Sequence, residues 1–326
     1  MLVVNEKDLR SSISLTEAIN VIEDGFTRLA NGEVNLPPVM SLDLPEVKGE
    51  MHIKGAHIGG DESFVIKLAT GFYDNPLIGL PSGAGMMLVF SARTGFPEAL
   101  LLDNAYLTDL RTAAAGAVAA KYLAGKEPET VGVIGAGTQG RFQVRALAEV
   151  RKFQRVLVYD LDSARSASYA QEMPELLGVP VAAMNDPEPV VRESDVLITA
   201  TPASRPIVQA RWLRSGLHIT AMGTDSPYKQ ELESEALARA DLLVCDLKTQ
   251  CFERGELHHG LKDGFIAESD PIVELGELTS GRHPGRTDEA EITICDLTGV
   301  GVQDAAIAGL AYQKALQGGL GSQLEA

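Results

Sequence analysis

The residues with the clearest chemistry form a glycine-rich turn between two apolar segments. Residues 131–140 read Val-Gly-Val-Ile-Gly-Ala-Gly-Thr-Gln-Gly, and a helical stretch then leads to the apolar segment Val156–Asp160. A strand, a glycine turn that opens a helix, and a second strand that ends on an acid are typical of a dinucleotide-binding βαβ unit. Gly135 and Gly137 let the backbone approach a diphosphate, and the start of the helix offers free N–H groups and a positive dipole end. The turn therefore predicts a site for an anion.

The acid at the end of the second segment, Asp160, indicates which dinucleotide binds. It lies about twenty residues beyond the turn, where a carboxylate accepts both ribose hydroxyls of an adenosine and repels a 2′-phosphate. A glycine turn alone can be purely structural, and this acid supplies the context that favours binding. We therefore predict NAD(H) rather than NADP(H). Thr138 and Gln139, at the start of the helix, are expected to contact phosphate.

Two cationic side chains, Lys67 and Arg111, each allow two interpretations. Lys67 lies in the apolar run Phe64–Ala69, where a lysine needs a charge partner or an open cleft. Alternatively, it protects an edge strand from aggregation. Arg111 falls in the opening turn of an expected helix, where the macrodipole disfavours a cation unless an anion is bound nearby. Alternatively, it is an exposed arginine.

Further ionisable residues follow two expected strands. Glu50, His52 and Lys54 alternate with apolar residues, so they line one face of a strand, which is either functional or the wet side of a sheet. Asp225 comes just past the carboxyl end of an expected strand, where ligands bind in an open α/β sheet. An Asp before Ser-Pro is also an ordinary turn residue. Lys229 is either its salt-bridge partner or a cofactor contact.

Composition excludes several classes of partner. The chain has 326 residues and a formal charge of −17, from 45 acids and 28 bases, which disfavours binding to nucleic acid or to an anionic membrane. The 3 cysteines lack a CxxC spacing, so we expect neither a disulfide framework nor a zinc site. The chain has no apolar run of about eighteen residues. We expect a cytoplasmic protein that does not enter a membrane.

The N-terminal elements that must position these residues predict a small α+β domain. A capping box at Ser14–Glu17 begins an amphipathic helix that ends at Asn31-Gly32. An alanine-rich helix, with Thr108 as its expected cap, runs to about residue 124, and Gly125–Pro128 then breaks it. Between these helices short strands are predicted at residues 49–53, 64–69, 86–90 and 99–102.

From Thr130 onward strand and helix signals alternate, which implies a parallel, doubly wound sheet. The strands that we predict after the glycine turn lie at residues 196–200, 217–222, 242–245 and 292–295. A final helix, residues 302–315, lies beyond the last strand. We therefore predict an α/β protein with a Rossmann-type NAD domain at 121–301. A smaller α+β substrate and dimerisation domain at 1–120 is completed by 302–326.

Taken together, the motifs resemble those of the ornithine cyclodeaminase/mu-crystallin family over nearly the whole chain. Two shorter segments, Asp74–Pro76 and Leu100–Asn104, are most similar to cyclodeaminase-like proteins associated with ectoine utilisation. The motifs that carry the family resemblance are Lys67 in its strand, Leu107–Ala114, Gly135–Gln139, Met222–Asp225 with Lys229–Leu232, and Asp296–Gly299 followed by Val302–Asp304.

This resemblance implies a homodimer whose N-terminal domain provides the interface and the substrate pocket. Lys67 and Arg111 would hold the carboxylate of an amino acid, and Asp225, with Lys67, would be catalytic. His52 and Thr298 would lie near the substrate. The residues that would contact the cofactor are Ser82, Arg111, Thr112, Gly135, Gly137, Thr138, Gln139, Asp160, Thr201, Met222, Lys229 and Leu297.

The resemblance leaves three activities open. A cyclodeaminase, a lyase, uses NAD⁺ to oxidise the α-carbon of a diamino acid to an imine, releases ammonia on cyclisation and returns the hydride. An NAD(P)H-dependent oxidoreductase reduces a free imine such as pyrroline-2-carboxylate, or oxidises an alanine-type amino acid. A non-catalytic protein binds a dinucleotide and a small ligand. The segment Pro37–Ser41 lacks an arginine that many members carry, and His52 or Glu50 occupies a region where ornithine-using members place a carboxylate, which argues against ornithine itself.

Overall fold

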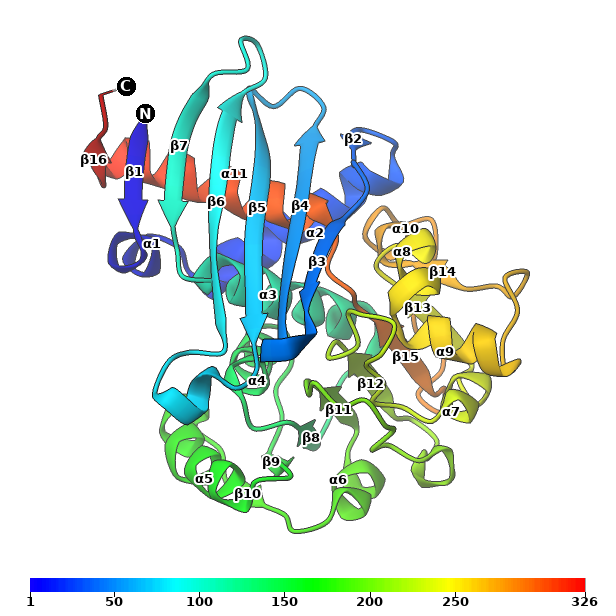
Figure 1. Ribbon diagram of the computed structural model, residues 1–326. Coiled ribbons are helices and arrows are strands. Elements are labelled where there is room, and N and C mark those ends of the chain that lie inside the picture. The colour runs from blue at the N-terminus through cyan, green and yellow to red at the C-terminus, as the bar shows by residue number, and fades with distance from the viewer. Residues whose placement is uncertain (326) are drawn as a thin grey trace. The chain divides into compact units, whose positions relative to one another are not determined.

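The computed structural model describes residues 1–325, and the chain forms two compact units (Figure 1). The first unit comprises Met1–Arg111 with Val300–Ala326, and the second comprises Thr112–Gly299. The division falls inside helix α3 (Tyr106–Leu123), nine residues before the break at residue 120 that the sequence suggested. Among residues 1–325, no helix is both long and apolar enough to cross a bilayer.

The first unit is built on a mixed sheet in the order β16-β1-β7-β6-β5-β4-β2, and β3 also pairs with β4. Most neighbours are antiparallel, and β1 and β7 are parallel. Because β5 lies between β4 and β6, the edge-strand interpretation of Lys67 is wrong. The strands are β1 (Leu2–Asn5), β2 (Val34–Asn35), β3 (Met40–Leu44), β4 (Gly49–Ile58), β5 (Ser63–Phe72), β6 (Gly83–Ser91), β7 (Pro97–Leu102) and β16 (Ser322–Gln323).

Helices cover one face of this sheet. Figure 1 shows α11 (Gly301–Gly318) behind the strands, with α2 (Leu15–Ala30) beside it, and α11 contacts β4, β5 and α2. The predicted capping box of α2 is confirmed, because Ser14 and Glu17 bond each other's backbone N–H groups. The remaining helices of this unit are α1 (Glu6–Ser12) and two 3-10 turns, η1 (Pro45–Val47) and η2 (Asn75–Ile78).

Helix α3 starts three residues earlier than a cap at Thr108 would imply. Thr108 lies inside the helix, so its predicted role as the cap is wrong. Asp103 caps this end instead, because its Oδ2 accepts the Leu107 N–H at 2.9 Å. Asn104 and Ala105 have φ values of 49° and 70°, a left-handed turn that a reading of helix propensity does not anticipate.

The second unit is a parallel sheet in the order β10-β9-β8-β11-β12-β15-β13-β14. The predicted doubly wound sheet is confirmed, with the change of direction beside β8. Its strands are β8 (Thr130–Ile134), β9 (Arg155–Tyr159), β10 (Val181–Ala183), β11 (Val196–Thr199), β12 (His218–Ala221), β13 (Leu242–Cys245), β14 (Val273–Glu274) and β15 (Thr293–Asp296). The central strands are buried along their length, as expected for a sheet covered on both faces.

Short helices connect these strands. The β8–β9 connection contains α4 (Thr138–Val150), and the next contains α5 (Ser163–Leu177). The other helical segments are α6 (Pro187–Glu193), η3 (Ala210–Trp212), α7 (Ser234–Ala238), α8 (Lys248–Arg254), α9 (Glu256–Asp263) and α10 (Leu275–Thr279).

Candidate active site

The glycine turn of the second unit forms a cradle for an anion. Gly135 has φ 107°, and a Cβ there would lie 2.6 Å from the Ala200 carbonyl oxygen. A Cβ at Gly140 would lie 2.1 Å from the Gly135 carbonyl oxygen, so only glycine allows α4 to start this close to the turn. Among the described residues, no side chain caps α4 at Gly137, and the N-terminal end of a helix is where N–H groups and the dipole favour phosphate. This geometry fits a diphosphate.

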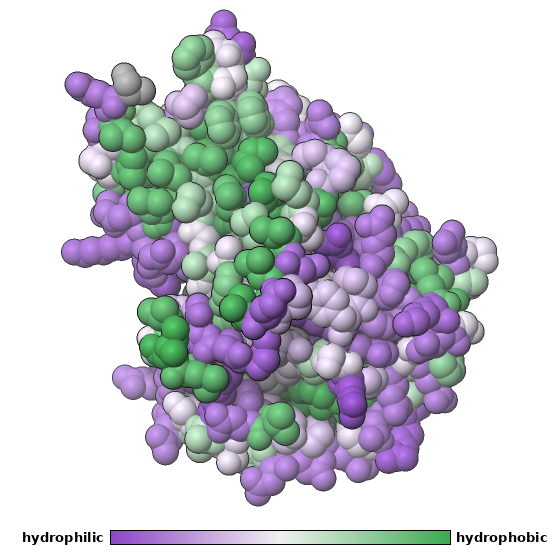
Figure 2. Space-filling view, viewed as in Figure 1, coloured by the Kyte–Doolittle hydropathy of each residue, from purple (hydrophilic) through white to green (hydrophobic). Residues whose placement is uncertain are grey.

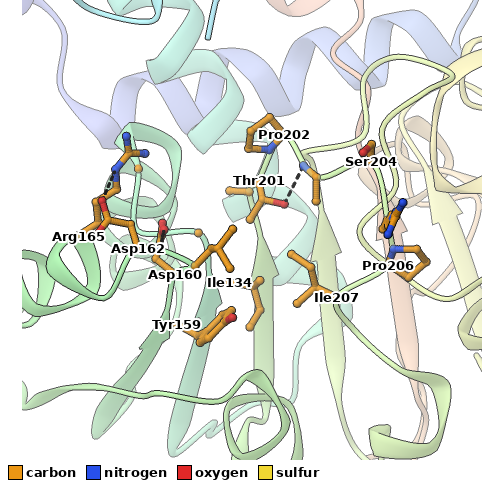
Figure 3. Close-up of a pocket in the computed structure, with 16 residues that line it drawn as sticks. Ile134, Tyr159, Asp160, Asp162, Arg165, Thr201, Pro202, Ser204, Pro206 and Ile207 are labelled. Atoms are coloured by element: carbon orange, nitrogen blue, oxygen red, sulfur yellow. Dashed lines mark hydrogen bonds and ion pairs between the residues drawn. The ribbon is translucent and has the colours of Figure 1, made fainter. Parts of the chain in front are cut away.

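A cavity of about 790 Å³ opens at the carboxyl ends of β8, β9 and β11. Figure 3 shows Asp160 and Thr201 on opposite sides of it, with Ile134 between them. Parallel α/β sheets bind ligands at this edge. The cavity brings together four of the predicted cofactor residues, namely Gly135, Gly137, Asp160 and Thr201.

Asp160 has a second role that the sequence did not reveal. Its Oδ2 accepts the Ala136 N–H at 2.8 Å, and its Oδ1 accepts the Asp162 N–H at 2.9 Å. The carboxylate therefore braces the glycine turn as well as lining the cavity. Each oxygen has a further lone pair that can accept a ribose hydroxyl.

The loop after β12 carries Asp225 and Lys229. Lys229 Nζ donates to Asp225 Oδ1 at 2.7 Å, and only 6% of the Lys229 side chain is exposed. The predicted salt bridge is therefore confirmed. Asp225 remains about one-third exposed, so its carboxyl group can reach a ligand in solution.

Two buried acids hold this loop, and sequence reasoning missed both. Glu231 accepts Thr199 Oγ1 at 2.7 Å, the Thr201 N–H at 2.6 Å, Thr201 Oγ1 at 2.8 Å and the Gly223 N–H at 2.8 Å. Glu256 accepts Thr224 Oγ1 at 2.5 Å and the Glu231 N–H at 2.8 Å. The pair thus anchors both the start of the loop and its end.

Burial perturbs the pKa of each of these acids. It raises the pKa of Glu231 to about 7, although its four donors act in the other direction. Burial, together with the nearby Glu231, raises the pKa of Glu256 well above its usual range. Only their spacing in three dimensions reveals this pair, because 25 residues separate them in the sequence.

The other predicted residues of the second unit lie along the same sheet edge or its helices. Met222 directly follows β12 and is buried, and the Leu297 N–H donates to Ala221 at 2.9 Å. Thr298 Oγ1 donates to Asp246 Oδ1 at 3.0 Å. Gln143 of α4 donates to the Thr112 carbonyl oxygen at 2.9 Å. Thr138 and Gln139 form the first turn of α4.

In the first unit, Lys67 and Arg111 meet at Asp304. Asp304 belongs to one of the family motifs in the sequence, but the sequence predicted no role for it. Lys67 Nζ lies 3.0 Å and Arg111 Nε 3.1 Å from the same Asp304 Oδ1. The exposed fractions are 2% for Lys67, 6% for Arg111 and 0% for Asp304, so the reading of Arg111 as an exposed residue is wrong. Arg111 is the sixth residue of α3 rather than part of its opening turn.

Further ionisable groups lie near this cluster of Lys67, Arg111 and Asp304. Lys54 lies opposite Lys67 in the β4–β5 register and is also buried. Burial, the charge of Arg111 and, to a lesser extent, Lys54 lower the pKa of Lys67 to about 7, against the opposing effect of Asp304. Burial raises the pKa of Asp103, the other nearby acid. A bound carboxylate would add a negative charge near Lys67 and favour its charged form.

Glu50 and His52 belong to a polar chain on β3 and β4. Tyr73 Oη donates to Glu50, and His52 Nε2 lies 3.7 Å from the other Glu50 oxygen. Ser41 Oγ contacts His52 Nδ1 at 3.0 Å. Glu50 is only 5% exposed, so the interpretation of this row as the wet side of a sheet is wrong. Ser82, an exposed residue before β6, lies outside these polar groups of the first unit and accepts the Phe72 N–H.

Comparison of the sequence with known proteins identifies the family of this chain. The profile of the ornithine cyclodeaminase/mu-crystallin family matches residues 1–319. The chain belongs to that family. A Sinorhizobium fredii protein named as an uncharacterized cyclodeaminase is 45% identical over 100% of this chain and 99% of its own length.

Solved structures of the family have the same fold and include NAD(H)-bound enzymes. A Thermococcus litoralis Δ¹-pyrroline-2-carboxylate reductase, in complex with NADH and L-proline, has a TM-score of 0.95 at 33% identity and covers 99% of this chain and 100% of its own. An archaeal alanine dehydrogenase dimer with bound NAD has a TM-score of 0.92 at 36% identity, over 100% of this chain and 99% of its own. The ornithine cyclodeaminase/mu-crystallin fold thus supports more than one reaction on amino and imino acids.

Proposed function

We propose that this family member is an NAD(H)-dependent oxidoreductase that interconverts an α-imino acid and the corresponding α-amino acid. The observation that carries the proposal is the buried pair of Lys67 and Arg111, held on one oxygen of Asp304. Such a pair suits the single α-carboxylate that amino and imino acids share. The glycine cradle and the cavity beside Asp160 supply the dinucleotide half of the reaction.

Each part of the reaction has residues suited to it. The N–H groups at the start of α4 would bind the diphosphate, Asp160 would accept the ribose hydroxyls, and Lys67 with Arg111 would bind the carboxylate. When bound, the nicotinamide supplies or accepts the hydride at the α-carbon. Asp225 delivers a proton to the substrate nitrogen on reduction and removes it on oxidation. Reduction then consumes one imine, one NADH and one proton.

Cyclodeamination is the second candidate, and Glu50 is the observation that favours it. Glu50 is a buried carboxylate on β4, the strand that neighbours Lys67, and it could receive the distal ammonium of a diamino acid. The β4–β5 register places Glu50 opposite Gly71, four residues along β5 from Lys67. The pair of Lys67 and Arg111 requires no second charged group on the substrate, so imine reduction is the better supported reaction.

The outer face of the first unit's sheet supports a homodimer. Alternate residues of β5, β6 and β7 point away from α11 and are apolar, and Figure 2 shows them as a continuous hydrophobic face. A contiguous apolar sheet face of this kind is typical of an interface between proteins. The residues on this face are Phe64, Ile66, Leu68, Met86, Leu88, Phe90, Leu100 and Leu102.

One set of assays separates the candidates. The protein is mixed with NADH and either Δ¹-pyrroline-2-carboxylate or pyruvate with ammonia, and absorbance of NADH is followed. Net oxidation of NADH is expected for the oxidoreductase. Ammonia release from a diamino acid without net NADH change would instead identify a cyclodeaminase. If NADH binds but neither reaction occurs, the enzymatic proposal is wrong and a binding protein remains.

A further inference from the structure

The start of α11 is pressed against the strand that neighbours Lys67. A Cβ at Gly301 would lie 2.3 Å from the Gly55 carbonyl oxygen of β4, so glycine allows the helix to begin in contact with the sheet. Asp304 lies in the first turn of α11, and α11 packs against β5 as well as β4. Asp304 is fully buried, and its Oδ2 has no hydrogen-bond partner among residues 1–325.

Asp304 Oδ1 has two cationic neighbours from elements far apart in the sequence. Lys67 comes from β5 and Arg111 from α3, at 3.0 Å and 3.1 Å. Gln303, the preceding residue, offers Arg111 a second acceptor, since its Oε1 lies 3.5 Å from Nη1. The same turn of α11 therefore fixes both cationic side chains.

Without Asp304 the cations would repel one another at close range. Lys54 faces Lys67 from β4, Arg111 faces it from α3, and Asp103 faces it from the turn before α3. On β6 the residue opposite Lys67 is Met87, which carries no charge. Like charges on opposed strand positions are unfavourable, and burial increases the effect. Asp304 is the acid in contact with both Lys67 and Arg111.

We propose that Asp304 is a positioning residue for substrate binding, which holds Lys67 charged and beside Arg111 so that the two cations receive one carboxylate together. The inference rests on the proposed function for the identity of the ligand. Asp304 itself is enclosed and does not touch the substrate. It acts by setting the distance between two donors and the protonation of one of them.

Asp304→Asn tests the proposal through the pH dependence of carboxylate binding. The NADH-loaded protein is titrated with L-proline and with L-alanine by calorimetry between pH 6 and pH 9. In the unaltered protein affinity is expected to fall as pH rises through about 7, where Lys67 loses its proton. In the variant this fall should begin at least about one pH unit lower, with affinity at pH 8 reduced about tenfold or more.

Two further variants separate positioning from simple destabilisation. Lys67→Arg combined with Asp304→Asn should lose the pH dependence between pH 6 and pH 9, because arginine stays charged. Asp304→Glu should keep the pH profile of the unaltered protein with weaker binding. The matched control is Glu17→Gln, which removes the ion pair between α2 and Lys314 of α11 and should leave carboxylate binding unchanged.

Each outcome decides one question. If Asp304→Asn binds L-proline and L-alanine with the affinity and pH profile of the unaltered protein, the positioning role is wrong. If Asp304→Asn does not fold, the Asp304→Glu profile decides in its place, and a shifted profile there overturns the proposal. Carboxylate binding with the expected profile but no turnover would reject the oxidoreductase function while leaving the role of Asp304 intact. No carboxylate binding by the unaltered protein would overturn both.

Discussion

Replacing Glu231 with glutamine should change how stability depends on pH and should loosen the loop that carries Asp225. Glu231 accepts four hydrogen bonds, two on each oxygen, including the Thr201 N–H and the Gly223 N–H. A glutamine side chain accepts on only one of its two terminal atoms. One of those two backbone N–H groups therefore loses its partner in the variant, at about 1–3 kcal/mol.

The pKa of Glu231 gives the size and sign of the pH effect. Burial raises it from 4.5 to about 7, so the folded protein binds the proton more tightly than the unfolded chain does. The contribution to stability is complete below pH 4.5, declines as pH rises to about 7, and is then lost. The difference between a pKa of 4.5 in the unfolded chain and about 7 in the folded protein corresponds to about 3 kcal/mol of unfolding free energy. Glutamine stays neutral, so Glu231→Gln lacks this decline.

The assay is urea unfolding of both proteins at pH 5 and pH 8, at one fixed protein concentration. At pH 5 the variant should be less stable by about 1–3 kcal/mol. By pH 8 the difference should have shifted by up to about 3 kcal/mol in favour of the variant. Glu188→Gln, which removes a surface acid paired with Arg192, is the control and should track the unaltered protein. If the difference for Glu231→Gln is the same at both pH values, the ionisation argument is refuted.

Three further predictions concern the cofactor, the proton and the interface. Asp160→Ala should weaken NAD(H) binding about tenfold or more, because it removes a ribose acceptor and the hydrogen bond to the Ala136 N–H. It should also reduce discrimination against NADP(H). Fluorescence titration with NADH and NADPH measures both affinities, and a strong NADP(H) preference in the unaltered protein would contradict the assignment. Asp225→Asn should abolish turnover and keep NADH affinity within about twofold, since it removes the proton donor. Steady-state kinetics measures the turnover, and the same fluorescence titration measures the NADH affinity. Normal turnover in the variant would remove Asp225 from the mechanism. Leu88→Glu should convert a dimer to a monomer, because it places a charge in the centre of the apolar sheet face. Sedimentation velocity measures the assembly state, and an unchanged dimer in the variant would show that another surface forms the interface.

The second unit could be predicted well from the sequence because its signals are local. The glycine turn at Gly135, the apolar strands and the acid at Asp160 lie within one βαβ unit, and the structure has this unit where the sequence indicated. The four later strands that we predicted also fall within about two residues of their bounds, whereas the short strands β10 and β14 were not predicted. Consecutive parallel strands buried on both faces give continuous apolar runs that are easily recognised.

The first unit was harder to predict because its important contacts join distant residues. Lys67 and Asp304 are 237 positions apart, and nothing near either residue shows that they meet. The row of Glu50 and Lys54 alternates like the wet face of a strand, yet both are buried. Alternation gives the face on which a side chain lies, but packing by other elements decides whether that face is exposed.

Buried charge in both units points to function rather than to folding. Ion pairs such as Lys67 with Asp304 are weak sources of stability, because desolvation offsets much of their attraction and well-packed apolar replacements of buried ion pairs are often neutral or stabilising. The same holds for Glu231 and Glu256, whose raised pKa values show that burial disfavours their charged forms. Under the proposed function, the first cluster would receive the substrate carboxylate, and the second holds the loop of Asp225. A well-packed apolar core would often be at least as stable as one that contains these buried ionisable side chains. Buried ionisable groups of this kind are expected at active sites.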